Sequence, residues 1–162
     1  VGTLTKALAA GLRLGFIVAP RALRERVLAA RAVVDRQGDA ALELAVAELM
    51  EDGELLRHAW RARREFQRRR DVLVAALRLR LGDVLDFEVP RGGLALWARA
   101  PRVDVEAWAA RALAAGVRFF TGRHYDPRGR PLRALRLGFA HLDERELERA
   151  VVVMAQTLPR TR

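Results

Sequence analysis

An uninterrupted helical pattern runs from Glu54 to Leu81 and sets the layout of the chain. One side of this pattern carries the apolar residues Leu56, Trp60, Phe66, Leu73 and Leu77. Their spacing is typical of an amphipathic helix that packs one face against a core. A glycine, Gly82, follows and stops the pattern. We therefore expect one long helix, with mainly helical sequence before it and strand-forming sequence after it.

The sequence before the long helix predicts a loop, a short strand and two helices. Residues 1–13 are turn-rich, and the apolar run Leu14–Ala19, closed by a proline, is typical of a buried strand. Helical periodicity covers Arg21–Val34 and Ala40–Glu51, with a break at Asp35–Asp39. The apolar run has no strand near it in sequence, and a buried strand with unpaired backbone groups is costly. We expect it to belong to a second sheet, most of which lies outside this chain.

The sequence after the long helix predicts a small sheet with helices. In chain order we expect strands at Val84–Val89 and Leu94–Ala100, a helix from Asp104 to Ala115, a strand at Val117–Phe120, a loop over Thr121–Pro131, a strand at Leu135–Ala140 and a helix from Asp143 to about Leu158. The residues Pro90–Gly93 between the first two strands favour a turn. A hairpin-bearing, antiparallel or mixed sheet covered by helices on one side is an α+β domain.

Composition limits the possible functions only partly. The chain has 162 residues, of which 51% are apolar, and a formal net charge of +10. This apolar content can form a core, and the positive charge admits a nucleic-acid partner. The densest positive run lies between Arg57 and Arg70, on the long helical pattern. Such a run is typical of the solvated face of an amphipathic helix, which we favour over a nucleic-acid surface.

Several absences also bear on function. The chain has no cysteine, which excludes disulfides and thiolate metal sites and favours a reducing compartment, the cytoplasm. The apolar run Leu14–Ala19 is too short to cross a membrane, and no signal peptide is visible. The first residue is not methionine, so we expect a fragment of a longer protein. We expect no metal site, because no histidine pair has ligand spacing. The tryptophans Trp60, Trp97 and Trp108 are assigned to core or interface positions.

Lys6 is the only lysine among 30 basic Lys and Arg residues. Arginine cannot lose its proton and attack a carbonyl, whereas lysine can. The hydroxyls of Thr3 and Thr5 and the guanidinium of Arg13 lie close to Lys6 in sequence, and such groups are good phosphate ligands. An amine beside a phosphate site suits an aldehyde cofactor that carries a phosphate, namely pyridoxal 5'-phosphate. The alternative is that an arginine-rich chain retained one lysine by chance.

The stretch Gly2–Phe16, GTLTKALAAGLRLGF, resembles the lysine loop of the class I/II aminotransferases, which are fold-type I pyridoxal-phosphate enzymes. It looks most like the aminotransferase-like effector domain of MocR-type regulators of the GntR group. Their loop reads Ser/Thr-Phe-Ser-Lys, followed by Pro-Gly-Leu-Arg-Leu-Gly. The resemblance implies that Lys6 is the Schiff-base lysine and that Thr3, Thr5 and Arg13 bind the cofactor phosphate. The loop departs from the family at Leu4, Thr5 and Ala10.

A second similarity lies at Leu135–Phe139, LRLGF, near the C-terminus. In the family the arginine of this strand binds the substrate α-carboxylate, so the resemblance assigns that role to Arg136. The residues alone also allow an edge-strand arginine that reaches solvent. The resemblance further implies that 1–52 is the C-terminal remnant of the large cofactor-binding domain. Residues 53–162 would be the small domain with its long linking helix.

Three functions remain open from the sequence. The first is the effector domain of a transcriptional regulator, which binds an amino acid or amino compound and acts on DNA through a module outside this chain. The second is a free-standing amino-acid aminotransferase that transfers an amino group to a 2-oxo acid. For both, the resemblance implies a homodimer. The third is a basic nucleic-acid-binding domain without cofactor, which predicts salt-dependent binding to any duplex.

Overall fold

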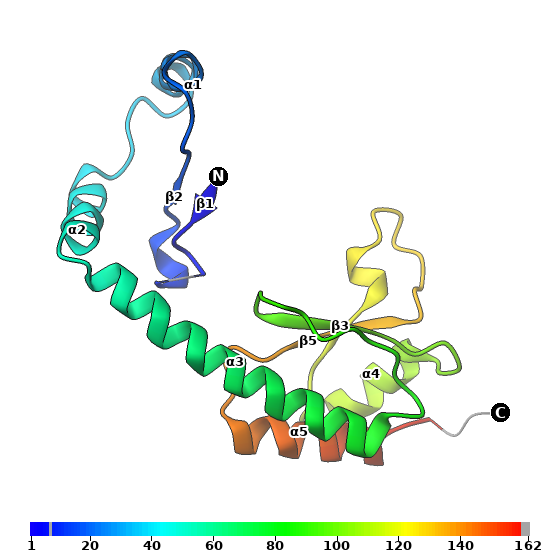
Figure 1. Ribbon diagram of the computed structural model, residues 1–162. Helices are drawn as coiled ribbons and strands as arrows, with labels where there is room; N and C mark the ends of the chain where they lie inside the picture. Colours follow the sequence, from blue (N-terminus) through cyan, green and yellow to red (C-terminus); the bar gives the residue numbers. More distant parts are fainter. Residues whose placement is uncertain (7, 160–162) are drawn as a thin grey trace. The chain divides into compact units, whose positions relative to one another are not determined.

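The computed structural model describes residues 1–6 and 8–159, in two compact units, Val1–Arg64 and Glu65–Arg162. Ala7 of the expected loop and Arg160–Arg162 of the expected small domain lie outside the described residues. The boundary between the units falls inside the long helix α3, Glu54–Leu81, which has the predicted bounds. The division into 1–52 and 53–162 inferred from the resemblance stays a prediction. Figure 1 labels the α-helices and, apart from β4, the strands of both units.

The first unit contains a two-stranded ribbon, two helices and the start of α3. Its elements are β1 (Gly2–Thr3), the 3-10 turn η1 (Ala10–Leu12), β2 (Gly15–Phe16), α1 (Arg21–Val34) and α2 (Ala40–Glu51). Both helices have the predicted bounds. The side chain of Asp39 caps α2 by accepting a hydrogen bond from the Leu42 amide, at 3.1 Å. Arg31 of α1 joins the two helices through Glu43, at 3.0 Å.

The prediction for Leu14–Ala19 was wrong in two respects. Only Gly15 and Phe16 form a strand, and that strand pairs antiparallel with β1. The run is also exposed, since Val18 keeps 85% of its surface. The sequence does not predict β1 as the partner strand, because β1 is only two residues long and carries a glycine. A Cβ on Gly2 would lie 2.4 Å from Cζ of Phe16, so a larger residue there would require the Phe16 ring to move.

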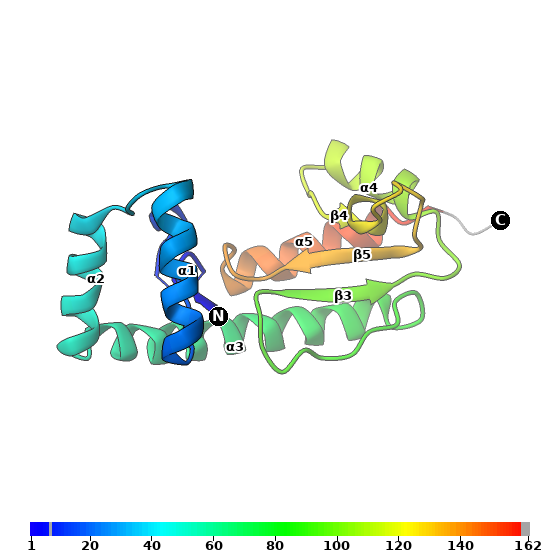
Figure 2. The same cartoon turned by 90° about the horizontal axis from the view of Figure 1, so that it is seen from above.

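The second unit is a three-stranded antiparallel sheet with helices on one face (Figures 1 and 2). Its elements are the end of α3, β3 (Ala95–Arg99), α4 (Val105–Ala114), β4 (Phe120–Thr121), η2 (Gly122–Tyr125), β5 (Ala134–Gly138) and α5 (Glu144–Gln156). The strands lie in the order β3-β5-β4. The helix-covered antiparallel sheet confirms the predicted fold class.

Two strand predictions in this unit need correction. Val84–Val89 is not a strand, because the amides of Val84 and Leu85 still donate to the Leu81 carbonyl at the end of α3. Only Asp86 pairs with β3, as an isolated bridge to Arg99. The strand expected at Val117–Phe120 is instead Phe120–Thr121, since the Val117 amide donates to Ala112 and closes the end of α4.

The loop expected over Thr121–Pro131 is more ordered than predicted. Its first residue belongs to β4, and the next four form the 3-10 turn η2. Later in the segment the carboxylate of Asp126 accepts hydrogen bonds from the amides of Arg128 and Arg130, at 3.0 and 2.9 Å. Side-chain acceptors of this kind can replace regular secondary structure in a turn.

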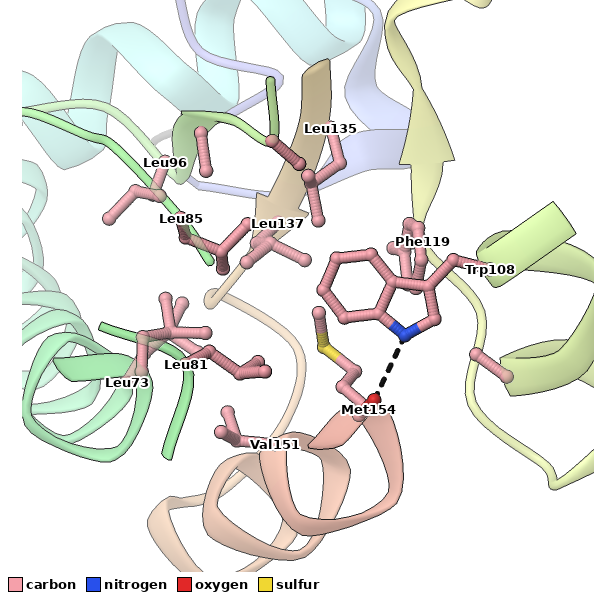
Figure 3. Close-up of a cluster of buried hydrophobic side chains, with 14 of the residues drawn as sticks. Leu73, Leu81, Leu85, Leu96, Trp108, Phe119, Leu135, Leu137, Val151 and Met154 are labelled. Atoms are coloured by element: carbon pink, nitrogen blue, oxygen red, sulfur yellow. Dashed lines mark hydrogen bonds between the residues drawn. The ribbon is translucent and has the colours of Figure 1, made fainter. Parts of the chain in front are cut away.

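The core of the second unit lies between the sheet and its helices (Figure 3). Trp108 of α4 is fully buried there, and its indole N–H donates to the Met154 carbonyl of α5 at 2.9 Å. The core position assigned to Trp108 is therefore confirmed. Around it pack apolar side chains of the sheet and helices, including Leu77, Leu96, Leu135, Leu137 and Val151. No helix in the described part of the chain could cross a membrane.

Candidate functional site

The backbone of the lysine loop, residues 1–16, is held at Leu4. This side chain keeps only 7% of its surface, although its neighbours are more exposed. The Leu4 amide donates to the Leu14 carbonyl at 2.9 Å, and the Leu4 carbonyl accepts from the Leu8 amide at 2.8 Å. A buried apolar anchor with both backbone groups paired fixes the start of the turn that presents Lys6.

The polar side chains of the loop are largely available to a ligand. Lys6 and Arg13 are exposed, and Thr5 is half-buried. Arg13 adopts the left-handed conformation, with φ 50°, at the end of η1. Within the described residues, neither Lys6 nor Arg13 forms an ion pair, and the first acidic residue in the sequence is Glu25. Two cations beside hydroxyls, without a nearby carboxylate in sequence, suit a phosphate anion.

Thr3 has a local role that the sequence did not predict. Its hydroxyl donates to the Leu14 carbonyl at 3.4 Å and accepts from the Thr5 amide at 3.3 Å. The first bond crosses from β1 to the residue before β2, and the second closes a local turn between Thr3 and Thr5. Thr3 therefore positions the loop, whereas the hydroxyl of Thr5 makes no hydrogen bond within the described residues and is the better candidate for direct phosphate contact.

Arg136 lies in the middle of β5, in the second unit. It is paired with Trp97 of β3 on one side and with Phe120 of β4 on the other. Its strand neighbours Leu135 and Leu137 are buried in the core, so the alternation of a strand directs Arg136 to the opposite, helix-free face. Arg136 as a residue is half-buried, and it has no ion-pair partner among the described residues.

Trp97 beside Arg136 was missed by the sequence reasoning, which assigned it to a core or an interface. It keeps 42% of its surface and lies on the helix-free face. One signal was present, because Leu96 and Ala98 on either side are apolar and β3 alternates. The alternation within β3 does not show which strand lies next to Trp97.

Other ionisable groups do not extend either site. Hydrogen bonds from Arg130 lower the pKa of Asp126, and hydrogen bonds from Arg68 lower the pKa of Glu65. Both carboxylates are therefore held by arginine partners of their own. Within residues 1–6 and 8–159, no group of three or more His, Asp or Glu side chains is placed to hold a metal ion.

Comparisons with known proteins agree with the lysine-loop similarity. Residues 1–154 match the family model of the class I and II aminotransferases. The chain is 26% identical over 159 residues to aromatic-amino-acid aminotransferase 1 of Thermococcus litoralis, covering 98% of this chain and 38% of the relative. It is 31% identical over 156 residues to the probable rhizopine catabolism regulatory protein MocR of Rhizobium meliloti, covering 93% and 31%.

A solved structure extends the similarity to the fold. The α-aminoadipate aminotransferase LysN of Thermus thermophilus, complexed with N-(5'-phosphopyridoxyl)-L-leucine, matches with a TM-score of 0.81 and 25% identity. The match covers 96% of this chain and 40% of LysN. The chain thus spans about a third to two fifths of the length of these relatives.

Proposed function

The chain belongs to the class I and II aminotransferase family, and we propose that it is the part of a pyridoxal-phosphate-dependent protein that holds the cofactor through Lys6. The observation that carries this proposal is the lysine loop. Residues 2–16 contain the single lysine of the chain, Thr5 and Arg13, and neither Lys6 nor Arg13 forms an ion pair among the described residues. These donors fit a phosphorylated aldehyde.

Each residue of the loop has a proposed role. Bound pyridoxal phosphate supplies an aldehyde that condenses with amines and a ring that withdraws electrons from the substrate Cα. The Nζ atom of Lys6 holds the cofactor and moves the proton at that Cα. The guanidinium of Arg13 and the hydroxyl of Thr5 bind the phosphate, and Thr3 keeps the loop in shape. In the second unit, Arg136 binds the ligand carboxylate.

Among whole-protein functions, we favour the effector domain of a MocR/GntR-type transcriptional regulator that binds an amino acid or amino compound. Regulators and aminotransferases both occur among the relatives, so a free-standing aminotransferase is the second candidate. In either case we propose a homodimer. A winged helix-turn-helix ahead of this chain in the full-length protein would decide for the regulator, which would then reach DNA through that module.

The test of the lysine assignment is covalent trapping in the full-length protein. Borohydride reduction after incubation with pyridoxal phosphate should leave a phosphopyridoxyl mass on the Lys6 peptide. Lys6→Arg keeps the charge but cannot attach the aldehyde, so the adduct should vanish. Arg13→Ala should weaken cofactor binding about ten- to hundredfold, as expected for a lost charged hydrogen bond. Arg21→Ala, whose guanidinium pairs with Glu25 outside the loop, is the matched control.

Two results would reject the assignment. One is an adduct that persists in Lys6→Arg, because another amine would then hold the cofactor. The other is an absence of cofactor uptake in the wild-type protein, combined with duplex binding that falls with salt and ignores Lys6→Arg. That combination would favour the basic nucleic-acid-binding alternative.

A further inference from the structure

Arg136 lies between two aromatic residues on the helix-free face of the sheet. Trp97 is its direct cross-strand neighbour on β3, and Phe120 is its direct neighbour on β4. Directly opposite residues in antiparallel strands extend from the same face, with Cβ atoms about 5 Å apart. The three side chains therefore form one row across the sheet, with the cation in the middle.

Two residues of η2 connect the ends of this row. The ring of Tyr125 meets Trp97 edge-on, with centroids 5.6 Å apart, and contacts His124 at 5.2 Å. His124 in turn lies 5.0 Å from Phe120. A continuous series of ring contacts thus joins Trp97 and Phe120, the two aromatic neighbours of Arg136. Such contacts hold ring orientations before any ligand arrives, which reduces the entropy cost of binding.

The row carries a positive charge at Arg136, and Arg118 adds a second cation next to Phe120. Arg136 has no carboxylate partner among the described residues, and the guanidinium of Arg118 lies 5.2 Å from the Phe120 ring centre. A half-buried guanidinium favours a carboxylate partner, which it can bind with two hydrogen bonds. The aromatic walls favour a flat apolar group next to that carboxylate. Together the two preferences define a class of ligand in which a carboxylate is joined to a flat apolar group.

We propose that the row Trp97–Arg136–Phe120 selects ligands in which a carboxylate is joined to an aromatic ring, such as aromatic amino acids and their 2-oxo acids. This inference rests on the proposed function, because it takes Arg136 as the carboxylate site. Arg136 binds the carboxylate, and Trp97 and Phe120 pack against the ring. Tyr125 and His124 act as positioning residues, since they hold the two walls in place.

The experiment uses unreactive carboxylates, so that binding is measured without turnover. Dissociation constants of 3-phenylpropionate and 3-cyclohexylpropionate are determined by calorimetry on the full-length protein with its cofactor. The two ligands match in length and carbon number and differ in flatness. The wild-type protein should bind the phenyl ligand about fivefold more tightly, within the range of an aromatic pair contact.

The variants separate the two parts of the proposal. Trp97→Leu and, independently, Phe120→Leu should bring the phenyl-to-cyclohexyl ratio to within about twofold of unity. Trp60→Leu, which changes an exposed tryptophan of the first unit, should leave the ratio unchanged. Arg136→Gln should weaken both ligands about equally. Two leucine variants are used so that one misfolded protein does not decide the result, and circular dichroism checks each fold.

The possible failures are distinguishable. If Arg136→Gln leaves both affinities unchanged, the carboxylate role in the proposed function is wrong, and the selectivity inference is overturned with it. If Arg136→Gln weakens both ligands, but folded Trp97→Leu and Phe120→Leu keep the fivefold ratio, only the aromatic selection is overturned. A wild-type protein without preference for the phenyl ligand also overturns it.

Discussion

At the scale of single residues, Trp108 is the most deeply buried of the three tryptophans. Its ring is fully buried between α4, α5 and the sheet, and it contacts Phe119 edge-on, with centroids 5.4 Å apart. Its N–H also pairs with a backbone carbonyl at the end of α5. A large side chain that fills a core and satisfies its only polar group stabilises through both effects.

Replacing this tryptophan should separate the two effects. Trp108→Ala should lower the free energy of unfolding by about 3–5 kcal/mol, because a cavity remains. Trp108→Phe should cost less, and the lost hydrogen bond accounts for about 1 kcal/mol of that cost, since the Met154 carbonyl still accepts from the Thr157 hydroxyl at 3.2 Å. Urea unfolding measures both. Trp60→Ala, at an exposed site, should stay within about 0.5 kcal/mol of wild type.

A pH-dependent prediction concerns Asp126. The side-chain hydrogen bond from Arg130 is the main cause of its lowered pKa, and amide donors in the same turn add to it. The folded pKa therefore lies below the unfolded value of about 3.9. The stabilisation is present above that unfolded value and is lost as pH falls through the folded pKa.

Asp126→Asn should therefore destabilise the 126–130 turn at neutral pH but not in strong acid. Hydrogen exchange of the Arg128 and Arg130 amides, compared between variant and wild type at several pH values, measures the effect. The exchange rates are first corrected for the intrinsic pH dependence. If the corrected exchange rates of variant and wild type differed equally at pH 7 and at pH 2, the ionised Asp126 carboxylate would not be the cause of the stabilisation.

At the scale of elements, the helices follow from local signals. Asp143 begins α5 with a capping box, in which its carboxylate accepts from the Glu146 amide and the Glu146 side chain accepts from the Asp143 amide, both at 2.8 Å. The same aspartate cap begins α4 at Asp104. These groups satisfy amides that a helix start leaves unpaired, which explains why the predicted helix starts agree with the structure.

Removing the cap gives an element-level prediction. Asp143→Ala should lower the free energy of unfolding by about 1 kcal/mol. Glu148→Ala, on the exposed side of the same helix, should change it by less than about 0.5 kcal/mol. Chemical denaturation of both variants provides the comparison. If Asp143→Ala and Glu148→Ala lowered the free energy of unfolding equally, helix charge, and not the cap, would set the stability of α5.

At the scale of the whole molecule, burial is distributed unevenly between the two units. Among the described residues, the core cluster runs from Leu73 to Met154, within the second unit. The first unit contributes only Leu4 and Val46 to the buried apolar residues of that described part, and α1 has none. Local stability follows buried apolar contacts, so the two units should differ in stability.

Hydrogen exchange on the 162-residue chain should show this difference. Amides of β5 and α5 should exchange only through unfolding of the second unit, whereas amides of α1 should exchange many times faster. Mass spectrometry of peptic peptides resolves the two regions. Equal protection of α1 and α5 would show that the first unit has a source of stability other than its own buried residues.

By itself, the sequence determined the helices, the class of fold and the identity of the chemically distinctive residues. Periodicity and capping act within a few residues, so Arg21–Val34, Ala40–Glu51 and Glu54–Leu81 could be read directly. The lysine loop was recognisable because its residue types are adjacent in the chain. The roles proposed for Lys6, Thr3, Thr5, Arg13 and Arg136 stay predictions.

Only the tertiary structure decided which strands pair. It joined β1 to β2 and placed β5 between β3 and β4. Strand pairing depends on contacts between residues far apart in sequence, and local patterns do not specify the partner. For that reason the sequence could single out Arg136 but could not show Trp97 and Phe120 on either side of it. The lysine loop follows from chain order, whereas the aromatic row around Arg136 follows from the fold.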